Sequence, residues 1–186
     1  MKKLIRFFLN SMPRGVMQRL APVATRVASV FYLGRGVECP VCGRRYRKFM
    51  PYGYVTVRGN ALCPGCLSLE RHRLMELYLR DRTDFYSTTP LLLHVAPEAC
   101  FMRKFARQLG DNYITADLCS PLARVKMDVQ AIPFADNHFD VIFCNHIIEH
   151  VDDDRRAMSE LYRILKPGGW GIVQVPVDHT LAATDE

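Results

Sequence analysis

The stretch "LLLHVAPEACF", residues 91–101, predicts a short buried strand followed by a turn and the start of a helix. In α/β proteins a strand of this kind often ends at a turn where a nucleotide-type cofactor binds, and that turn is usually rich in glycine. Here Ala96 is small and Pro97 restricts the backbone, but no glycine follows. The chain therefore either lacks a cofactor site at this turn or builds one from other residues.

The pattern after residue 90 alternates between strands and helices. The expected strands are "PLLLHVA", "NYITADL", "RVKMDV", "FDVIFCNH" and "WGIVQVP". The expected helices are "CFMRKFARQLG" and "DDDRRAMSELYRILKPGG", the second with acidic residues at its start and glycine as its stop. Because strands separated by helices form a parallel sheet covered on both faces, we predict an α/β fold with a Rossmann-like open parallel sheet of about five strands.

Composition divides the chain into four predicted parts. Residues 1–36 form basic amphipathic helices broken by two prolines, and residues 37–67 form a small module rich in Gly, Pro and Cys. Residues 68–87 form a linking helix, and residues 88–186 form the Rossmann-like domain.

Charge separates the front of the chain from the back. The first 82 residues carry 16 Lys and Arg against four acidic residues, whereas the last 104 carry nine against 15. This basic front predicts contact with RNA or an anionic surface through residues 1–58, or with packed neighbours and solvent alone. No apolar run approaches the roughly 18 residues that a membrane span needs, and Arg6 and Asn10 interrupt the core of a secretory signal. We expect a cytoplasmic protein, with peripheral contact to a membrane as an alternative.

Four cysteines predict a metal site. They form two CxxC pairs separated by twenty residues, and the ligands are Cys39, Cys42, Cys63 and Cys66. A tight turn aims both sulfurs of each pair at one point, and two such turns complete a tetrahedron around zinc. Because four thiolates leave no open position, the zinc is expected to be structural, and a pair of redox sites is the alternative. His72 is expected to be a helix residue rather than a ligand.

The segment between the two pairs mixes basic and aromatic residues. Basic groups for phosphates and aromatic faces for stacking are what binders of single-stranded nucleic acid use. A small zinc ribbon also needs aromatic residues for its core and carries basic residues as solvated surface. Both interpretations stay open for Arg44, Arg45, Arg47, Lys48 and Arg58 with Tyr46, Phe49, Tyr52 and Tyr54.

Polar residues follow the ends of several predicted strands. Because ligands of an open parallel sheet bind beyond the carboxyl ends of its strands, these residues are candidates for a nucleoside site. They are His94 and Glu98 after the first strand, Asp117 after the second, Asp128 after the third, and Asn145 and His146 after the fourth. Asp117 is placed to accept hydrogen bonds from the hydroxyls of a ribose, and Asp128 from an adenine amino group.

Residues 88–177 resemble the class I S-adenosylmethionine-dependent methyltransferases, in the branch often called methyltransferase type 11. The stretches that carry the resemblance are "LLLHVAPE", "YITADL", "KMDVQAIPFADNHFDVIFCNHIIEHV" and "LYRILKPGGWGIVQVP". It implies S-adenosylmethionine as cofactor, ribose on Asp117, adenine on Asp128 and the Val129 backbone, and Asn145 and His146 beside the methionine end and the acceptor. Complete members continue with further helices and strands, so the resemblance also implies a domain truncated at its C-terminus, with the fifth strand at an open edge.

The departure from this family lies in the first motif. The family usually has an acid at the position of His94 and a glycine-rich turn over Ala96 to Cys100. A pyrophosphate would be repelled by Glu98, but S-adenosylmethionine presents an ammonium and a sulfonium, which are cations. Our hypothesis is that Glu98 takes over the ammonium contact and His94 is structural. The alternative is that Glu98 caps the following helix.

Three functions are compatible with these features. The first is a zinc-containing methyltransferase with an unidentified acceptor, RNA among the candidates, since a zinc knuckle also precedes the domain in some ribosomal RNA methyltransferases. The second is a zinc-ribbon interaction protein whose methyltransferase-like domain is not catalytic. The third is a methyltransferase of a small or lipid-linked molecule. His146 is the candidate base where the acceptor carries a proton, unless it and the Glu149/His150 pair only orient their loop.

Overall fold

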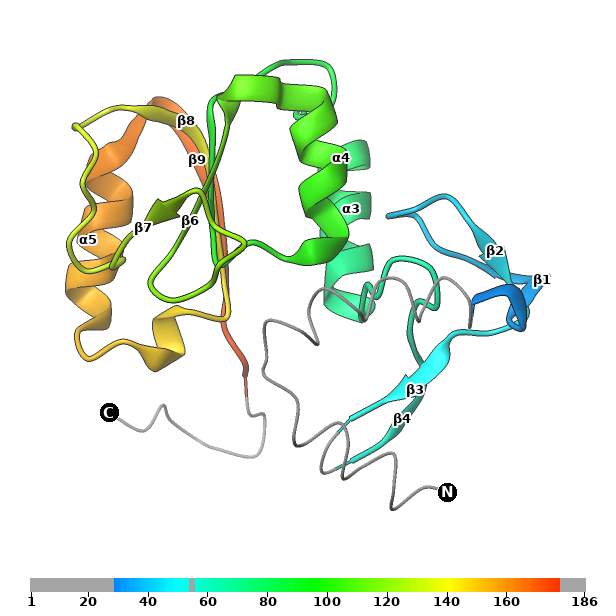
Figure 1. Cartoon of the computed structure of the whole chain (residues 1–186). Helices are drawn as coiled ribbons and strands as arrows, with labels where there is room; N and C mark the ends of the chain where they lie inside the picture. Colours follow the sequence, from blue (N-terminus) through cyan, green and yellow to red (C-terminus); the bar gives the residue numbers. More distant parts are fainter. Residues whose placement is uncertain (1–28, 54–55, 178–186) are drawn as a thin grey trace. The chain divides into compact units, whose positions relative to one another are not determined.

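A computed structural model describes residues 29–53 and 56–177 of the chain (Figure 1). Most of residues 1–36, where basic helices were expected, lie outside these described residues, and at the end of this range residues 33–36 belong to a strand (Leu33–Glu38) instead of a helix. The chain folds as two compact units, one holding the cysteine-rich segment and the helix after it, the other holding the sheet. No helix in the described part is both long and apolar enough to cross a lipid bilayer.

The first unit consists of two short antiparallel hairpins and one helix. Strand β1 (Leu33–Glu38) pairs with β2 (Arg45–Tyr46), β3 (Met50–Tyr52) pairs with β4 (Arg58–Leu62), and α3 spans Glu70–Arg82. The Arg73 guanidinium ties this helix to the hairpins, because its Nη1 donates to the carbonyls of Ala61 and Ser68 at 2.8 and 3.0 Å. The same guanidinium lies 4.3 Å from the ring centroid of Phe49. The helix therefore belongs to the same unit as the cysteines.

The second unit is a five-stranded parallel sheet with helices between its strands. Its order is β7-β6-β5-β8-β9, and every pairing is parallel. The elements in chain order are β5 (Leu92–Val95), α4 (Ala99–Leu109), β6 (Tyr113–Asp117), β7 (Val125–Lys126), β8 (Phe139–Asn145), α5 (Asp154–Ile164) and β9 (Leu165–Gln174), with short 3-10 turns over Gly110–Asn112 and Ile148–His150. The predicted Rossmann-like fold and its number of strands are confirmed.

Helices α4 and α5 lie on opposite faces of the sheet (Figure 1). The connection from β5 to β6 and the connection from β8 to β9 run in opposite directions along the sheet, and right-handed crossovers then place their helices on opposite sides. Both faces are consequently buried. Leu93 and Val95 belong to the core that includes Leu161 of α5, whereas His94 and Phe105 pack on the α4 face.

The helix α5 ends differently from the glycine stop that was expected. It ends at Ile164, and "KPGG" lies inside strand β9, which begins at Leu165. The last carbonyls of the helix find donors elsewhere, since Asn137 N donates to Arg163 O at 2.9 Å and His138 N to Ile164 O at 2.8 Å. Because a neighbouring loop satisfies these carbonyls, no glycine cap is needed. The start matches the expectation, because Asp153 accepts from Arg156 N at 2.8 Å.

Candidate functional site

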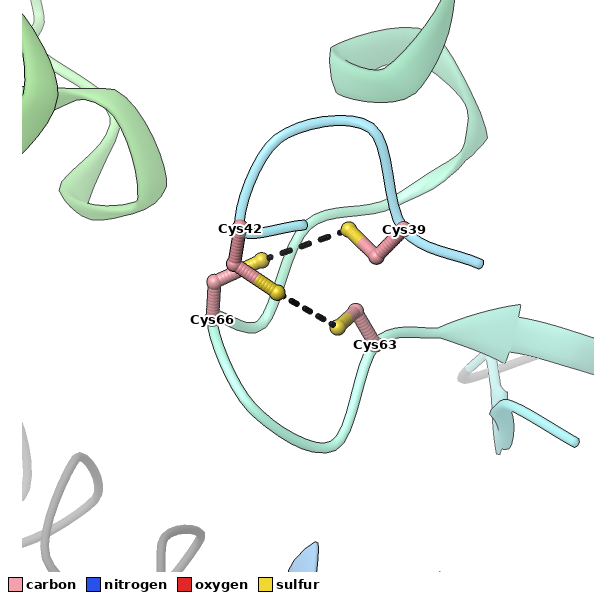
Figure 2. A group of neighbouring side chains, drawn as sticks. All are labelled: Cys39, Cys42, Cys63 and Cys66. Carbon is pink, nitrogen blue, oxygen red and sulfur yellow. Dashed lines mark hydrogen bonds between the residues drawn. The ribbon is translucent and has the colours of Figure 1, made fainter. Parts of the chain in front are cut away.

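The four cysteines predicted as ligands converge on one point (Figure 2). All four sulfurs lie within 4.8 Å of one another. Sulfurs of one CxxC pair approach those of the other, with Cys39 Sγ 3.7 Å from Cys66 Sγ and Cys42 Sγ 3.8 Å from Cys63 Sγ. Two independent redox sites would not need the two pairs to meet. The convergence of all four sulfurs thus matches a shared metal site.

The sulfur separations fit a zinc ion in particular. Zinc holds thiolates at about 2.3 Å in a tetrahedron, which places neighbouring sulfurs about 3.8 Å apart. The Cys39–Cys66 and Cys42–Cys63 sulfur separations are 3.7 and 3.8 Å. Cys39 and Cys63 are buried and the other two are partly buried, so water has little access to the cluster. The donor set and its geometry can therefore hold a structural zinc.

Each CxxC pair sits in the same kind of turn. Gly43 N donates to Cys39 O at 2.8 Å, and Leu67 N donates to Cys63 O at 3.0 Å. The residue after each second cysteine has left-handed backbone, with φ of 68° at Gly43 and 62° at Leu67. Glycine adopts this conformation freely and leucine does not, so the second turn is the strained one.

A serine supports the cluster from one side. The Ser68 hydroxyl lies 3.2 Å from the sulfurs of both Cys39 and Cys66, and its side chain is buried. A hydroxyl that donates to a thiolate stabilises the negative charge on sulfur. The spacing of the cysteines carried no signal for this serine, although its position two residues after Cys66 places it within reach.

The aromatic residues between the cysteine pairs are largely core. Tyr46 and Phe49 are 0% and 6% exposed, and their ring centroids lie 6.4 Å apart. The Tyr46 hydroxyl lies where a side chain at Gly65 would be, which explains the glycine in the second pair. Buried rings offer no face for stacking bases. Burial of Tyr46 and Phe49 therefore counts against the RNA-binding interpretation of this segment and supports the core interpretation.

His72 is not part of the cysteine cluster among the described residues, and its Nδ1 accepts a hydrogen bond from Leu69 N at 3.0 Å.

The second candidate site lies at the carboxyl edge of the sheet. Strand order reverses between β5 and β8, and such a reversal is where open parallel sheets bind ligands. Glu98 spans this reversal. Its Oε2 lies 2.6 Å from His94 Nε2 on β5, and its Oε1 accepts from Asn145 Nδ2 on β8 at 3.0 Å. The structure thus brings three of the predicted residues into one network.

His94 does not reach the surface. Its side chain is 0% exposed and packs against the rings of Phe105, Tyr113 and Phe143. Its Nδ1 lies 2.9 Å from the hydroxyl of Tyr113, a residue that sequence reasoning did not single out. No motif marks Tyr113, because its role depends on the parallel pairing of β6 with β5.

Ala96 shows how the turn works without glycine. Its φ is 48°, in the left-handed region, and its N–H donates to Ala116 O at 2.8 Å. The backbone thus has the conformation that a glycine would adopt at no cost, although the side chain is alanine. Alanine thus occupies the left-handed position of this turn in place of glycine.

Asp117 is the last residue of β6, and Asp128 lies two residues after the end of its neighbour β7. Asp117 Oδ1 accepts from the N–H groups of Cys119 and Ser120 at 2.7 and 2.6 Å. Asp128 Oδ1 accepts from Gln130 N at 2.8 Å. In each case these loop hydrogen bonds end on the Oδ1 atom, so they hold the carboxylate in place through one of its two oxygens. Val129, the neighbour of Asp128, is buried.

The loop after β8 carries the other predicted catalytic residue. His146 has φ of 56°, and its Nδ1 lies 3.2 Å from Glu149 Oε1. Its N–H donates to Gln174 O at 2.7 Å, which joins the loop to β9.

Burial, with the charges of Glu149 and Glu98 nearby, raises the pKa of Cys144 to about 12, so this thiol stays protonated. Glu98 and Glu149 thus place two carboxylates near this end of β8.

Comparison with known proteins finds a match to the segment that forms the sheet. The family model described as "Methyltransferase domain" matches residues 96–173. This segment runs from the turn after β5 through most of β9, so the methyltransferase resemblance expected from the sequence is confirmed for this part of the chain.

Curated relatives match over the same region. The chain is 30% identical over 122 residues to the ubiquinone/menaquinone biosynthesis C-methyltransferase UbiE of Haemophilus ducreyi, a match that covers 55% of this chain and 47% of that protein. It is 47% identical over 45 residues to the UbiE of Pseudoalteromonas translucida, covering 24% of this chain and 18% of that protein. The chain therefore spans less than half the length of these relatives.

Solved structures match part of the chain at low similarity. A candidate methyltransferase of Bacillus halodurans superposes with a TM-score of 0.45 and 21% identity, over 58% of this chain and 47% of that one. A SAM-dependent methyltransferase of Aquifex aeolicus gives 0.32 and 17%, over 41% and 50%.

Proposed function

We propose that the sheet unit binds S-adenosylmethionine and transfers its methyl group to a small-molecule acceptor. The observation that carries this proposal is the coincidence of two features. The methyltransferase family match begins at Ala96, and the carboxyl edge of the matched sheet carries Glu98, Asp117 and Asp128. This edge is where the fold places its ligands.

Asp117 and Asp128 would hold the adenosine end of the cofactor. The loops already use Oδ1 of each carboxylate, so Oδ2 of Asp117 would accept from the ribose hydroxyls and Oδ2 of Asp128 from the adenine amino group. The Val129 backbone would contact the adenine ring. Because the loop hydrogen bonds fix each carboxylate before binding, little conformational entropy is lost when the nucleoside arrives.

The carboxylates of this edge suit a cationic cofactor. The charges of Glu98 and Glu149 act on Cys144 at the end of β8. A pyrophosphate would be repelled there, whereas a sulfonium and an ammonium are attracted. When bound, S-adenosylmethionine supplies an electrophilic methyl group. The acid-rich edge therefore supports this cofactor over a dinucleotide.

His146 is our candidate for the base. Its Nδ1 is engaged by Glu149, which leaves Nε2 to take a proton from the acceptor. With the methyl group supplied by S-adenosylmethionine, Nε2 of His146 would take the proton that the acceptor releases. Asn145, one residue earlier, would align the reacting ends. Alignment and exclusion of water can supply most of the rate of methyl transfer.

A small acceptor is favoured over RNA. The relatives are named as C-methyltransferases of ubiquinone and menaquinone biosynthesis, which supports a carbon acceptor of small-molecule class. The aromatic residues that would have stacked RNA bases, Tyr46 and Phe49, are instead core.

The test is binding of S-adenosylhomocysteine by calorimetry. We expect binding with an affinity that falls at least tenfold in Asp117→Asn, because the ribose loses a charged acceptor. Asp111→Asn is the matched control, since Asp111 is exposed and precedes β6 at the opposite end of the strand. Absence of binding to the unmodified chain would overturn the proposal. Binding without turnover of any quinone-type acceptor would favour the non-catalytic alternative.

A structural zinc is the second part of the proposal. The four sulfurs supply a complete tetrahedral donor set, so the ion would hold the hairpins together and would have no open position for a substrate. Elemental analysis of protein purified without added metal is expected to give one zinc per chain. A stoichiometry near zero after purification under reducing conditions would contradict this assignment.

A further inference from the structure

Helix α4 begins with an acidic residue whose side chain does not cap it. Glu98 is the N-cap residue of this helix, yet its carboxylate makes no hydrogen bond to the helix start. Helix α5 provides the contrast, because the carboxylate of its N-cap, Asp153, accepts from Arg156 N at 2.8 Å. An acidic N-cap normally satisfies a free N–H in this way. The Glu98 side chain is used for something other than capping.

Two donors hold the Glu98 carboxylate across the reversal of strand order. His94 Nε2 lies 2.6 Å from Oε2, and Asn145 Nδ2 lies 3.0 Å from Oε1. One donor comes from β5 and the other from β8, the two strands that flank the reversal. Because each donor meets a different oxygen, the plane of the carboxylate is fixed.

A third residue orients the histidine. An ionised carboxylate only accepts hydrogen bonds, so Nε2 of His94 is the donor to Glu98. In the neutral ring Nδ1 is then an acceptor, and the Tyr113 hydroxyl 2.9 Å away donates to it. His94 is fully buried, whereas the Glu98 side chain retains 14% of its surface. Tyr113 and His94 are positioning residues, and Glu98 is the member of the network that reaches the edge.

We infer that the Glu98 carboxylate is the receptor for the ammonium group of the cofactor, held in place by His94 and Asn145. This inference rests on the proposed function and adds the residue that selects the amino-acid end of the ligand. The family usually places an acid at the position of His94. Here the strand position holds a buried donor, and the carboxylate sits four residues further along, on the other side of the turn.

The ligand chemistry follows from the charge and from the turn. A carboxylate favours an ammonium, which carries three donors and no acceptor. Ala96 has a left-handed φ of 48° and a small side chain, so a ligand can approach the backbone closely at this turn. A phosphate group would meet a fixed negative charge here.

The test compares two ligands that differ only in the amino-acid end. S-adenosylhomocysteine has the ammonium, and 5′-methylthioadenosine keeps the adenosine and lacks it. We expect Glu98→Gln to lower the affinity for S-adenosylhomocysteine about 10- to 100-fold and to leave the affinity for methylthioadenosine within about twofold. Asp117→Asn is expected to weaken both ligands. Equal affinities of Glu98→Gln and the unmodified chain for S-adenosylhomocysteine would overturn the inference.

Further variants keep the test decisive if Glu98→Gln does not fold. Tyr113→Phe removes only the hydroxyl that orients His94, and it is expected to weaken S-adenosylhomocysteine a few-fold without weakening methylthioadenosine. Glu98→Asp keeps the charge on a shorter side chain and is expected to retain part of the selectivity. An equal loss for both ligands in Tyr113→Phe would show a merely structural network and contradict the inference. Failure of the unmodified chain to bind either ligand would instead reject the proposed function.

Discussion

The two turns that carry the candidate sites respond differently to a missing glycine. After the second CxxC pair Leu67 takes a left-handed φ of 62°, and after β5 Ala96 takes one of 48°. In the cysteine-rich unit all four predicted ligands converge, so the spacing of the cysteines was enough to predict the site. In the turn after β5 the acid has moved to Glu98, so the residue type expected at one position is found at another. A turn can keep a left-handed backbone conformation while the acidic residue near it occupies a different position in the sequence.

The largest expected effect separates the two units. Cys63→Ser replaces a thiolate with a poor zinc ligand, and structural zinc sites in small modules supply on the order of 10 kcal/mol. We expect loss of the metal and loss of hydrogen-exchange protection in β1 to β4, with protection in β5 and β8 retained. The measurements are metal content and hydrogen exchange followed by mass spectrometry. Cys119→Ser, an exposed cysteine outside the cluster, should change neither. Simultaneous unfolding of both units would break the comparison.

The second largest expected effect is a loss of stability in the sheet unit alone. The Arg163 guanidinium donates to the carbonyls of Ile132 and Phe134 at 3.0 and 2.9 Å and to the Glu160 carboxylate. Arg163→Met leaves these acceptors without their charged donor and is expected to lower the free energy of unfolding of this unit by clearly more than a control substitution does. Urea unfolding measures it. The exposed Arg155 of the same helix provides the control, since Arg155→Met should cost no more than about 0.5 kcal/mol.

Low pH should weaken the ion pair between Arg163 and Glu160. The hydrogen bond from Arg163 lowers the pKa of Glu160 from 4.5 to about 2. Because the folded pKa lies below the unfolded one, the pair stabilises the fold above pH about 4.5, and this contribution is lost as the pH falls towards 2. We expect the unfolding temperature of the sheet unit to fall over this range and to fall less steeply in Glu160→Gln. Identical pH profiles for the two proteins would count against the link.

The smallest effect compares the two turns directly. Leu67→Gly and Ala96→Gly each relieve a left-handed residue, which costs about 1 to 2 kcal/mol, and each adds flexibility to the unfolded chain. We expect both changes to stabilise their own unit by about 0.5 to 1 kcal/mol, as read from thermal unfolding. Gly43→Leu, made in the equivalent cysteine turn, should destabilise by a similar amount. Stabilisation at only one turn would show that the two backbones are not equivalent.

Much of the fold was predictable because it follows from local patterns. The alternation of apolar strands with amphipathic helices after residue 90 predicted five parallel strands, and five are present. The end of α5 was not predictable from "LKPGG", because Asn137 and His138, far along a loop, supply the donors that a glycine cap would have provided. The strand expected over "RVKMDV" is also shorter than predicted, since β7 spans only Val125–Lys126.

The sequence by itself determined the cysteine site, the order of strands and helices, and the carboxylates at strand ends. Short-range spacing encodes these features, since a CxxC turn or a strand of alternating burial needs only its own residues. Only the tertiary structure decided what Glu98 does. Its partners His94 and Asn145 lie on β5 and β8, and 43 residues, 96–138, separate the two strands along the chain. Parallel pairing brings these strand ends together, and no local pattern records which side chains then meet.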